Sequence, residues 1–108
     1  MAQEYVILKD KSELGMIAIN KSVIQSISEI SIRDIENASI APVTRFSKPV
    51  VIRIEDNKLM VEADIEVKYG ANASVTSELV QNKIYENILF MTGFKASDIA
   101  INVVGFNI

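Results

Sequence analysis

Apolar and polar residues alternate without a fault along residues 58–69, the pattern of a β-strand with one buried face. The dipeptide Asp56-Asn57 precedes this strand and supplies a two-residue turn, because both residue types tolerate tight-turn geometry. The turn fixes the register of the preceding strand so that the apolar faces coincide. The sequence therefore predicts a β-hairpin with the pairs Ile54–Leu59, Ile52–Val61, Val50–Ala63 and Glu55–Lys58.

Residues 73–91 carry apolar side chains at helical spacing, but on two sides of the predicted helix. Asn72 is placed to cap its start, and Thr92-Gly93 to end it. One stripe consists of Ala73, Ser77, Val80, Ile84, Ile88 and Met91. The opposite side holds Val75, Leu79, Tyr85, Leu89 and Phe90, interrupted by Asn82 and Glu86. Because one core covers only one side, we expect the second side to contact another protein chain, although isolated exposed apolar residues are also ordinary.

The stretch from residue 20 to 37 gives two conflicting signals. Its Ile, Val and Ser content favours a strand, whereas its spacing favours a helix with Asn20 as the N-cap. We predict the helix, because six apolar residues share an arc of about 140°. Ile32 points away from that arc, so we expect it to join the outer apolar surface of the second helix. The arc consists of Val23, Ile24, Ile27, Ile30, Ile35 and Ala38.

Three further segments complete the fold. Residues 4–9 and 15–19 read as short strands joined by a polar turn at 10–13, and residues 99–104 as a last strand. That last strand is apolar on both faces, which is typical of an inner strand. The order β-β-α-β-β-α-β predicts an α+β fold, a two-layer sandwich with a mixed sheet, a central hairpin and two helices on one face.

At 108 residues the chain has the length of a single domain, residues 1–108. The net charge of −3 and the scattered basic residues argue against nucleic acid as a partner. The N-terminus lacks the pattern of a signal peptide, and no apolar run is long enough to span a membrane. We therefore expect a cytoplasmic protein that does not insert directly into the membrane.

The residue types restrict the possible chemistry. The chain has no His and no Cys, which removes the Ser-His and Cys-His nucleophile pairs and the common zinc sites. Glu62, Asp64 and Glu66 share one strand face and could hold a cation, but carboxylates on a flat strand do not converge on a point. A solvated face is the better interpretation. The sequence predicts no catalytic residue, no cofactor and no metal.

Two segments resemble the alkaline shock protein family of small bacterial proteins. The first runs from Gly15-Met16-Ile17-Ala18-Ile19 through Val23-Ile24 to Ile35-Glu36-Asn37. The second holds the more specific motifs in order: Val67-Lys68-Tyr69-Gly70, Val80-Gln81, Ile88, Met91-Thr92-Gly93-Phe94 and Ile101-Asn102-Val103-Val104-Gly105-Phe106. The resemblance also favours the helical interpretation of residues 20–37.

The resemblance implies a protein linked to cell-envelope or alkaline stress, without an established catalytic site, and in some relatives held at the membrane by a separate anchor protein. Two features depart from the family. Residues 41–49 are shorter and less basic than the family's usual stretch, and Ser74 and Val75 stand where Pro and an acidic residue are common.

Three functions follow as hypotheses. The first is a non-enzymatic interaction or scaffold protein that self-associates as a homo-oligomer or docks on a partner, linked to cell-envelope stress homeostasis. Its expected interface is Val75, Leu79, Tyr85, Leu89, Phe90 and Ile32. The second is a regulatory subunit of a lipid-metabolism enzyme, which some relatives accompany. The third, a small RNA-binding α+β module, is disfavoured by the acidic balance.

Overall fold

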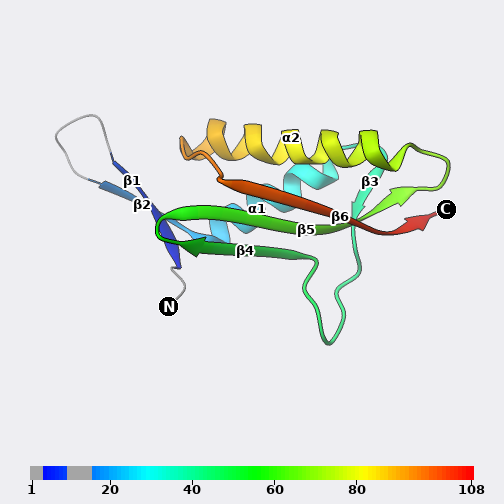
Figure 1. Cartoon of the computed structure of the whole chain (residues 1–108), viewed down its shortest axis with the longest axis horizontal. Helices are drawn as coiled ribbons and strands as arrows, with labels where there is room; N and C mark the ends of the chain where they lie inside the picture. Colours follow the sequence, from blue (N-terminus) through cyan, green and yellow to red (C-terminus); the bar gives the residue numbers. More distant parts are fainter. Residues whose placement is uncertain (1–3, 10–15) are drawn as a thin grey trace.

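The computed structural model describes residues 4–9 and 16–108, and Figure 1 shows their arrangement. Within these residues the chain forms two helices and six strands, in the α+β order that the sequence predicts, with one short strand added. The elements are β1 (Tyr5–Lys9), β2 (Met16–Asn20), α1 (Lys21–Arg33), β3 (Ala38–Ile40), β4 (Val50–Glu55), β5 (Lys58–Lys68), α2 (Ala73–Thr92) and β6 (Asp98–Asn107). The predicted turn at 10–13 and the start of the second strand at Gly15 lie outside the described residues.

The main sheet is built around β5. The strands β4 and β3 both pair antiparallel with one edge of β5, β4 over its first half and β3 over its second, while β6 runs parallel along the other edge. The predicted hairpin register is confirmed at all four pairs. Its turn residues Asp56 and Asn57 have φ angles of 50° and 58°, as a tight two-residue hairpin turn requires. The short strand β3 is the element that the sequence did not predict.

The prediction that the last strand is an inner strand is wrong for the single chain. Within the described residues, β6 pairs only with β5 and therefore forms an edge of the sheet. Its apolar character on both faces does not reflect neighbours on both sides. A bulge interrupts its pairing at Val104, which stands between the pairs Ile65–Val103 and Glu66–Gly105.

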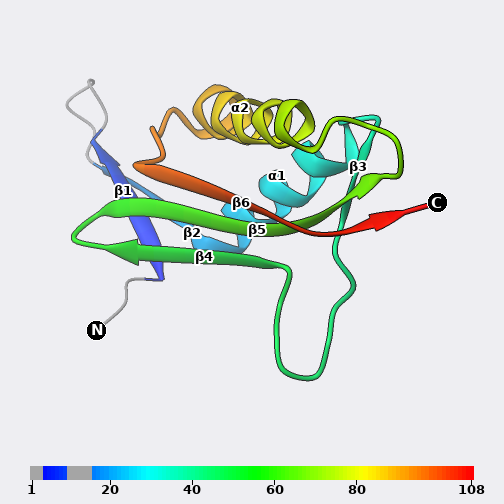
Figure 2. The ribbon, with the colours of Figure 1, turned by 45° about the vertical axis from the view of Figure 1, so that its right-hand side comes forward.

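The core lies between the helices and one face of the sheet. The alternate residues of β5 from Leu59 to Val67 are at most 2% exposed, and they belong to one buried cluster with Ile24 of α1 and Ile84 of α2. Figure 2 shows both helices beside the main sheet. Two residues expected in the core are exposed instead, Tyr69 at 76% and Met91 at 55%. Tyr69 follows the end of β5, and Met91 occupies the last turn of α2, so the core does not cover either side chain.

The helix α1 forms where predicted, and the Asn20 side chain caps it by accepting a hydrogen bond from the Ser22 N–H at 3.2 Å. The helix is, however, rotated by about 60° from the predicted arc. Val23 and Ile30 are nearly half exposed, whereas Ser28, Ser31 and Ile32 are completely buried.

The rotation of α1 has a polar cause. The hydroxyls of Ser28 and Ser31 donate to the carbonyls of Ile24 and Ile27, four residues earlier, so the buried serines leave no donor unsatisfied. Ser31 also accepts a hydrogen bond from the Asn87 amide of α2 at 2.9 Å. These small residues therefore face the second helix and carry the adjacent Ile32 into the core.

The strands β1 and β2 form a separate two-stranded sheet. The Asn57 side chain in the β4–β5 turn accepts from the Ile7 N–H at 2.7 Å and donates to the Ile7 carbonyl at 3.0 Å, as a neighbouring strand would. Val6 and Ile19 are buried against the core. The N-terminal hairpin is thus attached to the turn end of the main sheet without joining it.

Candidate interaction surfaces

The helix α2 presents one side to the core. Asn72 caps it by accepting a hydrogen bond from the Val75 N–H at 3.0 Å, and Gly93 ends it in the left-handed conformation with φ of 79°. The buried side consists of Thr76, Val80, Ile84 and Ile88. On either side of this buried face, Asn87 donates to the Ser31 hydroxyl of α1 and Gln81 donates to the Ile99 carbonyl of β6. The side of the helix that points away from the core is largely exposed.

Three large apolar side chains stand on the outer side of α2. Val75 is 53% exposed, Leu79 is 50% exposed and Phe90 is 89% exposed. At 100° per residue they lie within about 60° of one another. We call these three residues the α2 flank. The exposed Glu86 lies between Leu79 and Phe90 on the same side of the helix, and the described chain leaves the three apolar side chains largely uncovered.

The other residues of the expected interface are not on this flank. Tyr85, 36% exposed, lies about 120° from Leu79 around the helix, on the side of β6, and Leu89 is half-buried. Ile32 is 0% exposed, so its expected place on an outer surface is corrected to the interior between α1, α2 and the sheet. The expected interface is therefore not one continuous patch: Tyr85 lies on another side of α2, and Ile32 is not on the surface.

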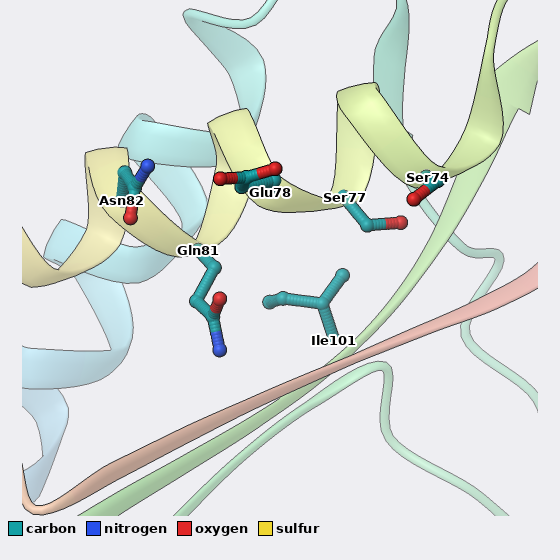
Figure 3. A pocket seen from close by; sticks show the side chains of 6 residues that line it. All are labelled: Ser74, Ser77, Glu78, Gln81, Asn82 and Ile101. Atoms are coloured by element: carbon teal, nitrogen blue, oxygen red, sulfur yellow. The ribbon is translucent and has the colours of Figure 1, made fainter.

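An open groove runs between α2 and the edge strand β6. Its larger part, about 380 Å³, is lined by Ser74, Ser77, Glu78, Gln81, Asn82 and Ile101. Figure 3 shows Gln81 reaching down from α2 while Ile101 points up from β6 toward the helix. A second part of about 270 Å³ continues past Tyr85 to Asp98. The only charged side chains lining these two parts are the carboxylates Glu78 and Asp98.

The three carboxylates of β5 lie on the sheet face away from the helices. Glu62 is exposed, whereas Asp64 and Glu66 are partly buried. Asp64 accepts a hydrogen bond from the Asn102 amide of β6 at 3.1 Å, which uses one of its oxygens to hold the two strands together. In the part of the chain that the structure describes, no three carboxylates stand close enough to hold a metal ion.

The segment before β4 carries an apolar tip that the sequence reasoning missed. Phe46 is 91% exposed and Val43 is 76% exposed. The Thr44 hydroxyl accepts a hydrogen bond from the Ser47 N–H at 3.1 Å, so residues 44–47 form a closed turn with Arg45 and Phe46 at its end (the loop below the sheet in Figure 2). Pro42 and Pro49 on either side were the available signal for a projecting loop.

The comparisons with known proteins fit this description. No curated protein matches the sequence. Neither α1 nor α2, the two helices of the described residues, has the length and hydrophobicity needed to cross a membrane. A family model matches residues 37–108, which are two-thirds of the 108 residues, and is described by a cell envelope-related function. The matched region begins before β3 and contains α2 and β6, whereas α1 and the first resembling segment lie almost wholly outside it. The chain therefore belongs to the alkaline shock protein 23 family, whose function is related to the cell envelope.

Proposed function

We propose that this protein is a non-enzymatic interaction protein of the cell envelope, which acts by docking on another protein surface. The observation that supports the proposal is the α2 flank, where Val75, Leu79 and Phe90 stand exposed on a long, well-capped helix. Covering these three side chains would contribute on the order of 4 kcal/mol of apolar burial. That gain suits a surface that is covered in the cell.

The proposed place of action is the cytoplasmic side of the envelope, with the membrane reached through a partner such as an anchor protein. The family's envelope-related function supports this setting. The absence of His and Cys supports a role without catalysis, because the commonest proton-transfer and nucleophilic groups are missing. Regulation of a lipid-metabolism enzyme and RNA binding have no observation of this structure in their favour.

The test is a pair of charge substitutions on the flank, Leu79→Glu with Phe90→Glu. Both side chains point outward, so the variant should keep the helix content and unfolding midpoint of the wild type. We expect the wild type to hold a stoichiometric protein partner when purified under mild conditions from its own cells, and the variant to lose it. The control is Ile30→Glu on α1, where an Ile about as exposed as Leu79 lies outside the flank.

The proposal fails if the folded variant keeps the same partner at the same stoichiometry. It also fails if the wild type elutes without a bound protein from both the membrane and the cytoplasmic fractions. Loss of the partner in the Ile30→Glu control as well would show that added negative charge, and not the flank, governs the association.

A further inference from the structure

The outer edge of β6 carries backbone groups that the described residues leave without a neighbouring strand. The Gln81 side-chain amide donates to the Ile99 carbonyl at 2.7 Å, so the backbone of Ile99 faces away from β5. Since successive residues of a strand point to alternate sides, the N–H and C=O groups of Ile101 and Val103 face the same way. Three residues therefore offer hydrogen bonds toward the groove beside α2.

The composition of β6 makes this edge unusual. From Ile99 to Ile108 there is no charged residue, and only Asp98, at the start of the strand, carries a charge. On the opposite edge of the sheet, β4 is only six residues long, carries the charged residues Arg53 and Glu55, and follows Pro49. These features disfavour pairing with a further strand. Edge strands usually carry such charges or prolines because an uncharged apolar edge pairs with other strands.

The groove leaves room for an added strand. Its larger part of about 380 Å³ lies directly above Ile101 and is open to solvent. A strand paired with β6 would place alternate side chains beside Ile101 and under the side of α2 that holds Ser77 and Gln81 (Figure 3). The bulge at Val104 ends the regular edge, so the available pairing segment is Asp98 to Val103.

We propose that β6 pairs antiparallel with β6 of a second copy of this chain, with Ile101 on the two-fold axis. Ile101 then lies opposite Ile101 of the second copy, and Ile99 lies opposite Val103 of the second copy, so β-branched side chains meet across the interface. This register makes about six backbone hydrogen bonds. The Ile99 carbonyl keeps its bond from Gln81, because a carbonyl oxygen accepts two.

A second copy brings an equally uncharged edge, rich in β-branched residues, to the pairing. Two chains of net charge −3 repel one another, and the segment Ile99–Val103 is a place where they meet without placing charge against charge. In the proposed register Asp98 falls opposite the bulge residue Val104 of the second copy, away from its own counterpart. A symmetric dimer also uses the same surface twice, as most homodimers do. The inference rests on the β6 edge and is independent of the α2 flank.

The first experiment compares Ile101→Pro with Ile101→Ala by light scattering over a range of protein concentrations. Both substitutions remove the Ile side chain, but only proline also removes the outward N–H, and it leaves the bonds to β5 in place. We expect a dimeric wild type, a dimer for Ile101→Ala, and an apparent dissociation constant at least about tenfold larger for Ile101→Pro. A wild type that stays monomeric, or a folded Ile101→Pro variant as dimeric as Ile101→Ala, overturns the proposal.

A second measurement does not depend on the folding of the proline variant. The chain has no cysteine, so a single Ile101→Cys substitution introduces one thiol at the proposed two-fold axis. Mild oxidation should link two copies, because paired strands bring Cα atoms about 5.5 Å apart, within the range of a disulfide. The matched control is Val51→Cys on the β4 edge strand, where the side chain is 38% exposed. Equal linkage of both variants, or none in Ile101→Cys, overturns the proposal.

The outcomes also separate this inference from the proposed function. The variant Leu79→Glu with Phe90→Glu should remain a dimer while it loses its partner, and Ile101→Pro should become monomeric without a direct change to the flank. If Leu79→Glu with Phe90→Glu is the variant that becomes monomeric, the self-association belongs to the α2 flank and the β6 assignment is wrong.

Discussion

The orientation of α1 is tested by truncating two isoleucines that are two residues apart in the same helix. Ile32 is 0% exposed and Ile30 is 47% exposed. The change Ile→Ala removes three methyl or methylene groups, which at about 0.8 kcal/mol each amounts to about 2.4 kcal/mol when all are buried. A residual cavity adds to this, so we expect Ile32→Ala to lower the free energy of unfolding by about 3–4 kcal/mol.

For Ile30→Ala about half of that transfer term applies and no cavity forms, so we expect a loss of about 1 kcal/mol. The gain in helix propensity is similar at both positions and cancels in the comparison. Urea unfolding at 25 °C and equal protein concentration measures the difference directly, and the melting temperature should fall by about 15 °C for Ile32→Ala against about 4 °C for Ile30→Ala. If the two variants lose equal stability, or Ile30→Ala loses more, α1 is oriented by its apolar spacing alone and the arrangement described here is wrong.

Three further substitutions test the end of α2, the attachment of β1 to the hairpin turn, and the N-terminal cap of α2. Gly93→Ala should lower stability by about 1–2 kcal/mol in urea unfolding, because φ is 79° and an added Cβ would lie 3.3 Å from the Leu8 Cδ2 atom; an unchanged midpoint would contradict this. Asn57→Gly keeps a residue suited to positive φ but removes both bonds to Ile7, so amide exchange at Ile7 should become faster while exchange within β5 does not; equal protection of Ile7 would refute the attachment. Asn72→Ala should cost about 1 kcal/mol through loss of the α2 cap, measured by thermal unfolding, whereas a neutral result would mean that water replaces the side chain.

The elements that were predictable from the sequence are those specified by neighbouring residues. The β4–β5 register follows from one dipeptide and the alternation on either side of it, and both helix starts follow from an asparagine before the first turn. The short strand β3 offers no such signal, because three residues are too few to show a period. Its pairing depends on β5, which is distant in the sequence.

The orientation of α1 was not predictable from apolar spacing because its buried face is partly polar. The hydroxyls of Ser28 and Ser31 form hydrogen bonds within the helix, so these residues cost little to bury. A pattern of apolar residues nevertheless assigns serine to the exposed side. For this reason the sequence analysis expected Ile32 on the surface, whereas the structure buries it in the core. The exposed residues of α2 were correctly placed outside the core, except that Met91 was assigned to it and Leu89 is half-buried.

The wrong assignment of β6 bears on the proposed dimer. Both faces of this strand are apolar, and that composition is typical of a strand with neighbours on each side. The described residues of the single chain give it one neighbour, β5, and leave its other edge to the groove beside α2. In the proposed pairing a second β6 occupies that edge, so β6 becomes an inner strand of a sheet that continues through both copies. The composition that is unexplained in one chain is then the composition that the assembly requires.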